Sequence, residues 1–206
     1  MKSLLLDESF AGAALDPALR WHCEPKRWSL QAGDRYLRIE PDPGTDFWRK
    51  THYGFEADNG HFLFTDVSGD FVLAVHVRFH PVHQYDQAGL MVRRSPSCWL
   101  KASVEYEPDG PSQLGAVVTR QGYSDWSTQA FPATAREIWL RVRRTGDDFV
   151  VDAARDGRSW EQIRMAHLEP DGSGEAVDCG LYACSPKGSG FVAEFCRLTI
   201  DGGTSP

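Results

Sequence analysis

The stretch Gln87–Tyr106, which reads QAGLMVRRSPSCWLKASVEY, contains two runs of alternating residues separated by a short turn. Successive side chains of a strand point to opposite faces, so each run, 87–94 and 99–106, has one face made of apolar residues. An antiparallel hairpin that pairs Val92 with Leu100 brings the two apolar faces together. A shift by one residue would place polar side chains among them and lose buried apolar surface. The stretch therefore predicts a β-hairpin whose apolar face belongs to the core.

The same register predicts a second, polar face on this hairpin. Its cross-strand pairs are Arg93 with Trp99, Met91 with Lys101, Gly89 with Ser103, and Gln87 with Glu105. Gly89 has no side chain, so it leaves a low floor beside Ser103 between longer side chains. Such a floor suits a ligand that lies on the sheet, although a glycine can also mark a bulge. We therefore expect ligand binding on this face.

The rest of the chain shows the same alternation, and no run of a dozen residues has a helical period. The predicted strands are 36–40, 47–53, 61–65, 71–79, 87–94, 99–106, 114–121, 138–143, 148–154, 160–164, 177–184 and 191–200. Turn residues separate them, and Asp156-Gly157 predicts a two-residue hairpin turn. Short strands at this spacing predict a single all-β domain, a sandwich or barrel, over residues 1–206.

Composition and motifs limit the classes of function. The net charge of −7 disfavours nucleic acid and anionic membranes as partners, because both attract basic proteins. Five cysteines form no Cys-x-x-Cys motif, and the first residues lack the apolar run of a signal peptide, so we expect a cytoplasmic protein with reduced thiols. The sequence contains no zinc-protease, nucleophile-elbow or phosphate-loop motif. We therefore predict no metal and no cofactor.

Several stretches carry a resemblance to a known family. They are Leu6–Phe10, Trp48–Phe55, Asp58–Phe62, Gln84–Val92, Trp99–Tyr106, Gly122–Ser127, Trp139–Val142, Ile163–His167 and Cys184–Gly188. Together they resemble a domain-of-unknown-function family with a concanavalin A-like lectin/glucanase fold, which includes a fungal protein named for regulation of enolase. The resemblance covers nearly the whole chain and implies a jelly-roll β-sandwich of two curved antiparallel sheets. It implies no catalytic residues, because the family has none that are established.

Aromatic and charged residues near the predicted strands are candidates for ligand binding. Trp48, Lys50 and His52 share one face of the predicted strand 47–53, where a flat ring can stack on a sugar and the cations can bind its oxygens. The alternative is that Trp48 packs under a loop.

The hairpin and its flanks supply further candidates. The polar face contributes Gln87, Lys101 and Glu105, and the same register places Tyr85 opposite Glu107. A hydrogen-bonded ladder at a solvated sheet edge is the alternative for this group.

A short aromatic segment is the third source of candidates. Tyr123–Ser127, which reads YSDWS, is predicted to be a loop that presents Tyr123 and Trp126. His167 is a weaker candidate for the same face, because a lone histidine is more often structural. We expect one groove that collects His52, Lys101, Glu105, Tyr123 and Trp126.

Glu105 also raises the question of glycoside hydrolysis, which needs two carboxyl groups about 5–9.5 Å apart. Glu105, Glu107 and Asp109 alternate along the chain, and glucanases of the lectin-like fold use a similar pattern. Here Pro108 and Asp109-Gly110 form a turn, so Asp109 is expected to leave the sheet and the group can be an ordinary acidic edge. The candidate second carboxylates are therefore Glu107 and Asp86.

These observations favour a binding module over an enzyme. The leading interpretation is a carbohydrate or small hydroxylated metabolite bound on the concave sheet, with a possible regulatory role through another protein. One alternative is a glycoside hydrolase that uses Glu105 and a second carboxylate. The other is a protein-interaction sandwich without a small ligand.

Overall fold

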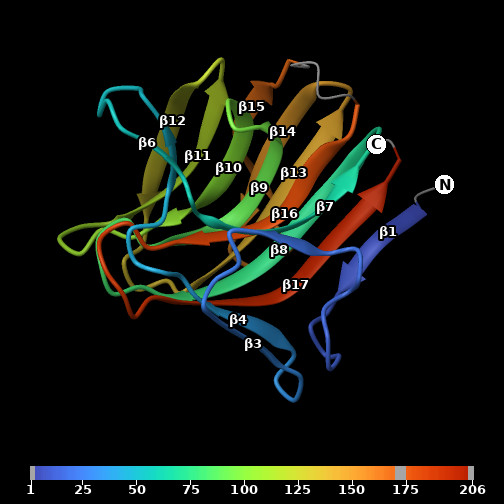
Figure 1. The fold of residues 1–206 in the computed structure, drawn as a ribbon, viewed down its shortest axis with the longest axis horizontal. Coiled ribbons are helices and arrows are strands. Elements are labelled where there is room, and N and C mark those ends of the chain that lie inside the picture. Colours follow the sequence, from blue (N-terminus) through green and yellow to red (C-terminus); the bar gives the residue numbers. More distant parts are fainter. Residues whose placement is uncertain (1–2, 170–174, 204–206) are drawn as a thin grey trace.

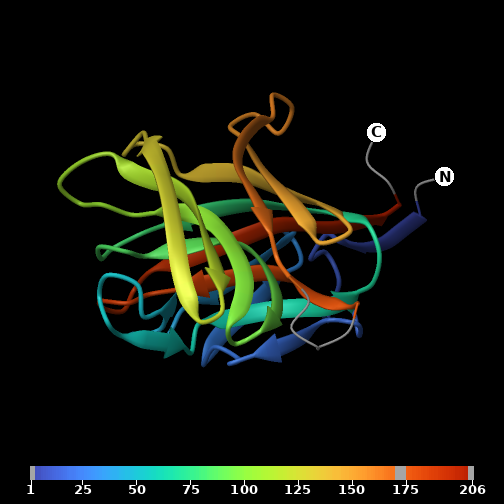
Figure 2. The same ribbon diagram turned by 90° about the horizontal axis from the view of Figure 1, so that it is seen from above.

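The protein is an antiparallel sandwich of two large β-sheets. In the computed structural model, which describes residues 3–169 and 175–203, these residues form 17 strands and no helix. None of them belongs to a helix that could cross a membrane. The chain winds between the two layers, and the strands of both sheets curve (Figures 1 and 2). The prediction of an all-β sandwich is confirmed.

The first sheet has eight strands. In spatial order they are β15 (Glu161–His167), β14 (Asp148–Ala154), β13 (Glu137–Thr145), β8 (Phe71–His80), β17 (Val192–Gly202), β4 (Tyr36–Glu40) and β3 (Arg27–Gln31), with β1 (Ser3–Glu8) paired to β17.

The second sheet has seven strands, and a two-stranded ribbon accompanies it. The order in the sheet is β12 (Tyr123–Phe131), β11 (Ser112–Arg120), β10 (Cys98–Glu105), β9 (Gln87–Ser95), β16 (Val177–Cys184), β7 (His61–Val67) and β2 (Arg20–His22). The ribbon consists of β5 (Phe47–Arg49) and β6 (Glu56–Asp58).

The two sheets differ in how many of their faces are buried. Along β8, every second residue from Phe71 to Phe79 is fully buried, and the residues between them are half-buried. This is the pattern of a sheet with one face on the core. In β9 and β10, nearly every residue is buried on both faces. The second sheet must therefore be covered on its outer side, and a second apolar cluster marks that cover.

The register predicted for the hairpin is confirmed. Strands β9 and β10 pair Val92 with Leu100 and Gln87 with Glu105, and both residues of the first pair are fully buried in the inter-sheet core. The opposite face is buried as well, since Lys101 is only 3% exposed. The hairpin therefore has an apolar core face and a polar face that is enclosed rather than open.

The low floor predicted at Gly89 is occupied by the protein itself. Gly89 pairs with Ser103 on one side and with Tyr182 on the other. The hydroxyl of Tyr182 reaches to 2.8 Å from the Ser103 hydroxyl, so its side chain must cross the glycine position. The fully buried Tyr182 therefore covers this part of the face and leaves no open floor for a ligand.

Three local predictions are wrong. The strand predicted over 47–53 ends at Arg49, the predicted loop at 123–127 is the start of β12, and the predicted turn at Asp156-Gly157 is longer than two residues. Residues 155–160 separate β14 from β15, because the Asp156 carboxylate accepts hydrogen bonds from the backbone N–H groups of Arg158 and Ser159. This side-chain turn competes with a tight hairpin.

His61, at the start of β7, gives the fold a testable pH dependence. Its Nε2 accepts a hydrogen bond of 2.9 Å from the backbone N–H of Asp42, which requires an unprotonated nitrogen, and its Nδ1 contacts the carbonyl oxygen of Cys23. Burial lowers the pKa of His61 below its ordinary value of 6.5. The unfolded chain therefore binds the proton more readily than the folded protein does.

We expect the contribution of His61 to the free energy of unfolding to fall as the pH drops below about 6.5, with a slope of at most ~1.4 kcal/mol per pH unit from this one proton. This contribution is the difference between the wild type and a His61 variant, because Glu105, whose pKa is raised, adds a slope of opposite sign. Urea denaturation between pH 4 and 8 measures the slope. His61→Gln should remove this contribution, whereas His80→Gln, at an exposed histidine, should not. Equal slopes for the wild type and His61→Gln would contradict the assignment.

Candidate functional site

The segment that contains β5 and β6 covers one part of the outer face of the seven-stranded sheet. Phe47 packs edge-on against the rings of Trp99 and Tyr182, with 6.2 Å between ring centroids in each case. The backbone N–H of Arg49 donates a hydrogen bond of 2.9 Å to the hydroxyl of Ser124 in β12. The ribbon is therefore attached to the sheet through β10, β12 and β16, near the left of Figure 1.

A tight turn follows β5 and decides where its aromatic residues lie. Lys50 and His52 have φ angles of 53° and 63°, in the left-handed region, so they are not strand residues. The indole N–H of Trp48 donates to the carbonyl oxygen of Thr51 at 3.0 Å, which closes the turn. The expectation that Trp48, Lys50 and His52 share a strand face is therefore wrong. The turn instead brings Tyr53 to 5.5 Å from Trp48, between ring centroids.

A small cavity of about 190 Å³, the inner pocket, opens between this turn and the sheet. Its aromatic and apolar walls are Trp48, Tyr53, Phe55, Tyr85, Val117 and Trp126, and its charged residues are Asp46, Lys101, Glu105 and Lys187. Aromatic walls with a few polar groups are typical of a small-molecule site.

A hydrogen-bonded network forms the floor of the inner pocket. The ammonium group of Lys101 donates to the carboxylate of Asp46 at 3.2 Å and to the side-chain oxygen of Gln87 at 3.0 Å. The amide nitrogen of Gln87 donates to Glu105 at 3.0 Å, and the Tyr182 hydroxyl donates to the Gln87 oxygen at 2.9 Å. These partners fix the position of every polar group on the floor, so the site is rigid before any ligand arrives.

Glu105 is the most perturbed acid of the inner pocket. Burial of its carboxyl group raises its pKa to about 8, and the neighbouring carboxylates of Asp46 and Glu107 contribute to the rise. The Lys101 ammonium and the hydrogen bond from Gln87 oppose it. Near neutral pH, Glu105 is therefore mostly a neutral acid that can donate a hydrogen bond.

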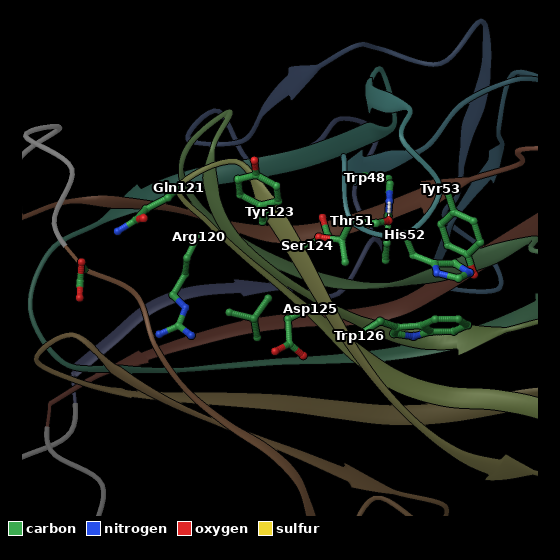
Figure 3. A pocket seen from close by; sticks show the side chains of 12 residues that line it. Trp48, Thr51, His52, Tyr53, Arg120, Gln121, Tyr123, Ser124, Asp125 and Trp126 are labelled. Atoms are coloured by element: carbon green, nitrogen blue, oxygen red, sulfur yellow. Dashed lines mark hydrogen bonds between the residues drawn. The ribbon is translucent and has the colours of Figure 1, made fainter.

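A wider depression of about 870 Å³, the outer groove, continues from the inner pocket (Figure 3). The two share Trp48, Tyr53 and Trp126 as a common wall. In Figure 3, the rings of Trp126, Tyr53 and His52 gather at one end of the groove, and Arg120 and Gln121 lie at the other. Tyr123, Ser124 and Asp125 of β12 line its length. The arrangement can hold a small unit in the inner pocket and a longer extension in the groove.

Most of the residues expected to bind a ligand lie at these two cavities. Trp48, Tyr85, Lys101, Glu105 and Trp126 line the inner pocket, and Trp48, His52, Tyr123 and Trp126 line the outer groove. Gln87 lies in the floor, and the Lys50 ammonium lies 5.5 Å from the ring centroid of Tyr123. Tyr85 has a φ angle of 73° and is not a strand residue facing Glu107.

Three expected residues do not join the site in the roles given to them. His167 lies at the end of β15 in the other sheet, where its Nδ1 contacts Asp148 at 2.7 Å. The Asp86 carboxylate accepts hydrogen bonds from the backbone N–H groups of Val82 and His83, so it stabilises a turn. Glu107 binds the side chain of Gln84 instead of lining the inner pocket.

Sequence reasoning missed Asp46, Tyr53, Phe55 and Lys187 in the inner pocket. Tyr53 and Phe55 lay inside the motif that includes Trp48, so the density of aromatic residues there was an available signal. Lys187 lies in the stretch Cys184–Gly188 that carries part of the resemblance, but no local pattern marks it as a ligand-binding residue, and Asp46 lies outside all of those stretches. Among the described residues, no group of three or more His, Cys, Asp or Glu side chains is placed to bind a metal ion.

Known proteins are similar to this chain in sequence and in fold. A family model described as a protein of unknown function, DUF1349, matches residues 21–202. The protein named regulation of enolase protein 1 from Saccharomyces cerevisiae is 37% identical over 180 residues, which is 87% of each chain. A crystal structure of a functionally unknown protein from Saccharomyces cerevisiae superimposes with a TM-score of 0.83 at 34% identity, and covers 91% of this chain and 98% of that one.

Two more distant structures show the fold alone. A xylan beta-1,4-xylosidase from Bacillus halodurans has a TM-score of 0.73 at 13% identity, and covers 95% of this chain and 39% of its own. The exoplasmic/lumenal domain of VIP36, in a Ca²⁺/Man3GlcNAc-bound form, has a TM-score of 0.57 at 11% identity, and the match covers 92% of this chain and 86% of that one. The protein is a concanavalin A-like jelly-roll β-sandwich, as the resemblance implied. By sequence match and coverage, the chain belongs to the DUF1349 family of proteins of unknown function.

Proposed function

We propose that this protein is a binding module for a carbohydrate or a similar polyhydroxylated molecule, bound in the inner pocket and extending along the outer groove. The observation that carries the proposal is the combination of stacking rings and fixed polar groups in one cavity. The ring of Trp126 offers a flat apolar face for the C–H surface of a sugar, and the carboxyl group of Glu105 on the floor offers a donor to a hydroxyl oxygen.

Relatives and fold neighbours support this proposal in two ways. The xylosidase and the Man3GlcNAc-bound VIP36 domain both have saccharides in their descriptions and share the sandwich. The yeast relative is named for regulation of enolase, which supports a regulatory role in which the bound ligand alters contact with another protein. A cytoplasmic location and the absence of nucleic-acid and membrane partners stay predictions.

Replacing Trp126 by alanine tests the proposal. Xylo- and manno-oligosaccharides, together with common monosaccharides, are titrated into the protein by calorimetry. The variant is expected to bind the best of them more weakly by about 1 kcal/mol, roughly fivefold, because the stacking face is lost. The matched control is Trp139→Ala, since Trp139 stacks on His76 in the other sheet, at 3.9 Å between ring centroids.

Two results would count against the proposal. Equal losses in the Trp126 and Trp139 variants would show that the effect is structural. Failure of every saccharide to bind the wild type would reject carbohydrate binding and favour the protein-interaction alternative.

Glycoside hydrolysis is the second candidate, and one observation favours it. Glu105, whose raised pKa keeps it protonated near neutral pH, lies beside the carboxylate of Asp46, and catalysis by two carboxyl groups requires such a difference. This pair replaces the pairs of Glu105 with Glu107 or Asp86. We prefer the binding function to hydrolysis because the Asp46 carboxylate already pairs with Lys101 and is therefore less available as a catalytic group.

Release of nitrophenol from aryl xylosides and glucosides measures the hydrolase activity. A hydrolase would lose its rate by roughly 100-fold or more in both Glu105→Gln and Asp46→Asn. Wild-type protein that binds sugar without releasing nitrophenol would exclude this function for the tested glycosides.

A further inference from the structure

Three cations without carboxylate partners lie at the two cavities. The described residues provide no ion-pair partner for Lys187 at the inner pocket, for Lys50 beside Tyr123, or for Arg120 at the far end of the outer groove. All three are exposed. The chain as a whole carries a net charge of −7, so unpaired cations at these two cavities run against the overall charge.

Lys187 is the cation best placed to meet a ligand in the inner pocket. Its ammonium group lies 5.4 Å from the ring centroid of Tyr85, which keeps the charge at the opening of the cavity. The other cation of the pocket, Lys101, is buried and already binds Asp46 and Gln87. Lys187 is therefore the charge that remains available for a ligand.

The two carboxyl groups of the inner pocket do not oppose an anion equally. Asp46 accepts hydrogen bonds on Oδ1 from Lys101 and from the backbone N–H of Phe47, so the ammonium charge of Lys101 offsets the charge of this carboxylate. Glu105 accepts a hydrogen bond from Gln87 on one oxygen and is mostly neutral near pH 7, so it acts as a donor toward the cavity. With the charges of Asp46 and Lys101 offsetting each other, the uncompensated charge at the inner pocket is that of Lys187, and Glu105 beside it is a neutral acid.

We propose that the ligand of the inner pocket is an anionic sugar, which carries a carboxylate or a phosphate group that pairs with Lys187 while its hydroxyl groups contact Glu105. This inference rests on the proposed function and names the chemical class of its ligand. The outer groove is lined by Arg120 but also by Asp125 and Glu169, so the inference concerns the inner pocket alone. A neutral sugar would leave the charge of Lys187 without a partner.

The pH dependence of binding follows from the charges around Glu105. The groups around it are Asp46 from the segment before β5, Tyr85 from the turn before β9, Gln87 from β9, Lys101 and Glu107 from β10 and its end, Tyr182 and Cys184 from β16, and Lys187 at the opening of the pocket. The pKa values of the Tyr182 and Cys184 side chains are raised by burial, so neither group is charged in this range. Above about pH 8, Glu105 becomes an anion and repels a ligand of the same sign.

Matched sugars that differ at one carbon test the inference. Glucose, glucuronic acid and glucose 6-phosphate, with the corresponding galactose and mannose series, are titrated by calorimetry at low salt and pH 7. At least one anionic member is expected to bind roughly five- to tenfold more tightly than its neutral parent. The acid and phosphate arms show which anion the pocket prefers.

Charge-removing variants assign that preference to the pocket. Lys187→Gln is expected to bring the anionic and neutral affinities together, and the exposed position of Lys187 leaves the fold intact. Lys26→Gln removes the same charge from an exposed site outside both cavities and is expected to change nothing. Raising the pH to 9 should weaken anion binding in the wild type but not in Glu105→Gln, which stays a neutral donor.

The outcomes separate this inference from the proposed function. Equal affinity for neutral and anionic sugars, or an anion preference that survives Lys187→Gln, would overturn the anionic ligand and leave carbohydrate binding intact. If none of these sugars binds the wild type, both the anionic ligand and the carbohydrate proposal fail.

Discussion

Replacing Gly89 by alanine is expected to lower the free energy of unfolding by about 3 kcal/mol. A Cβ atom at this position would lie 1.9 Å from the carbonyl oxygen of Ala102 and 2.9 Å from the Leu140 side chain. The carbonyl belongs to the neighbouring strand β10, so it cannot move without distorting the ladder between β9 and β10. Urea denaturation followed by tryptophan fluorescence measures the change.

Gly110→Ala is the matched control. No atom lies within 4 Å of a Cβ at Gly110, and the backbone there is not left-handed, so the change should be within about 0.5 kcal/mol. A Gly89→Ala variant as stable as the Gly110→Ala variant would show that β9 adapts, and that the close approach of the two strands is not required. Movement of β9 would also shift Tyr182, so sugar binding by the variant reports on the pocket floor.

The hairpin register could be predicted because it depends on residues close in sequence. Both strands, 87–94 and 99–106, alternate without interruption, and only one register matches their apolar faces. The enclosure of the second face could not be predicted in this way. It depends on Phe47, which lies 52 residues from Trp99 in the chain yet packs against its ring.

The prediction of a strand through the turn after β5 is wrong for a different reason. The left-handed φ angles of Lys50 and His52 occur at residues with side chains, whereas the sequence signal for such angles is glycine or asparagine. The alternation of strand faces was therefore applied to residues that in fact form a turn. The candidate residues Trp48 and His52 still line the cavities, because the turn folds back over the sheet that the strand would have extended.

The floor of the inner pocket was half predictable. Lys101, Glu105 and Gln87 share a face by strand parity alone, and they do form one network. Asp46 completes it from 55 residues away, through an ion pair with Lys101. The carboxylate that accompanies Glu105 in the inner pocket depends on that long-range contact, whereas strand parity pointed to Glu107 and Asp86, which do not line the pocket.

Lys101→Met is expected to destabilise the protein by about 3 kcal/mol. The ammonium group is almost fully buried and binds both Asp46 and Gln87, so the substitution removes a buried cation and leaves the Asp46 carboxylate without its partner. The same charge lowers the pKa of Glu105 in the wild type. Its removal should therefore raise that pKa above about 8, which tryptophan fluorescence of the folded protein can follow through Trp126.

A double variant separates the ion pair from simple packing. Asp46→Asn combined with Lys101→Met removes both charges, so it should recover a substantial part of the stability lost in Lys101→Met, because no unpaired carboxylate remains. Lys26→Met, at an exposed lysine, provides the matched control and should change stability by less than about 0.5 kcal/mol. If the double variant is no more stable than Lys101→Met, the loss arises from packing of the lysine stem between Trp99 and Tyr182 and the electrostatic explanation is wrong. If it recovers, the loss in Lys101→Met arises from the unpaired Asp46 carboxylate, and the packing of Phe47 on Trp99 with the hydrogen bond from Arg49 to Ser124 is sufficient to hold the β5 segment on the sheet.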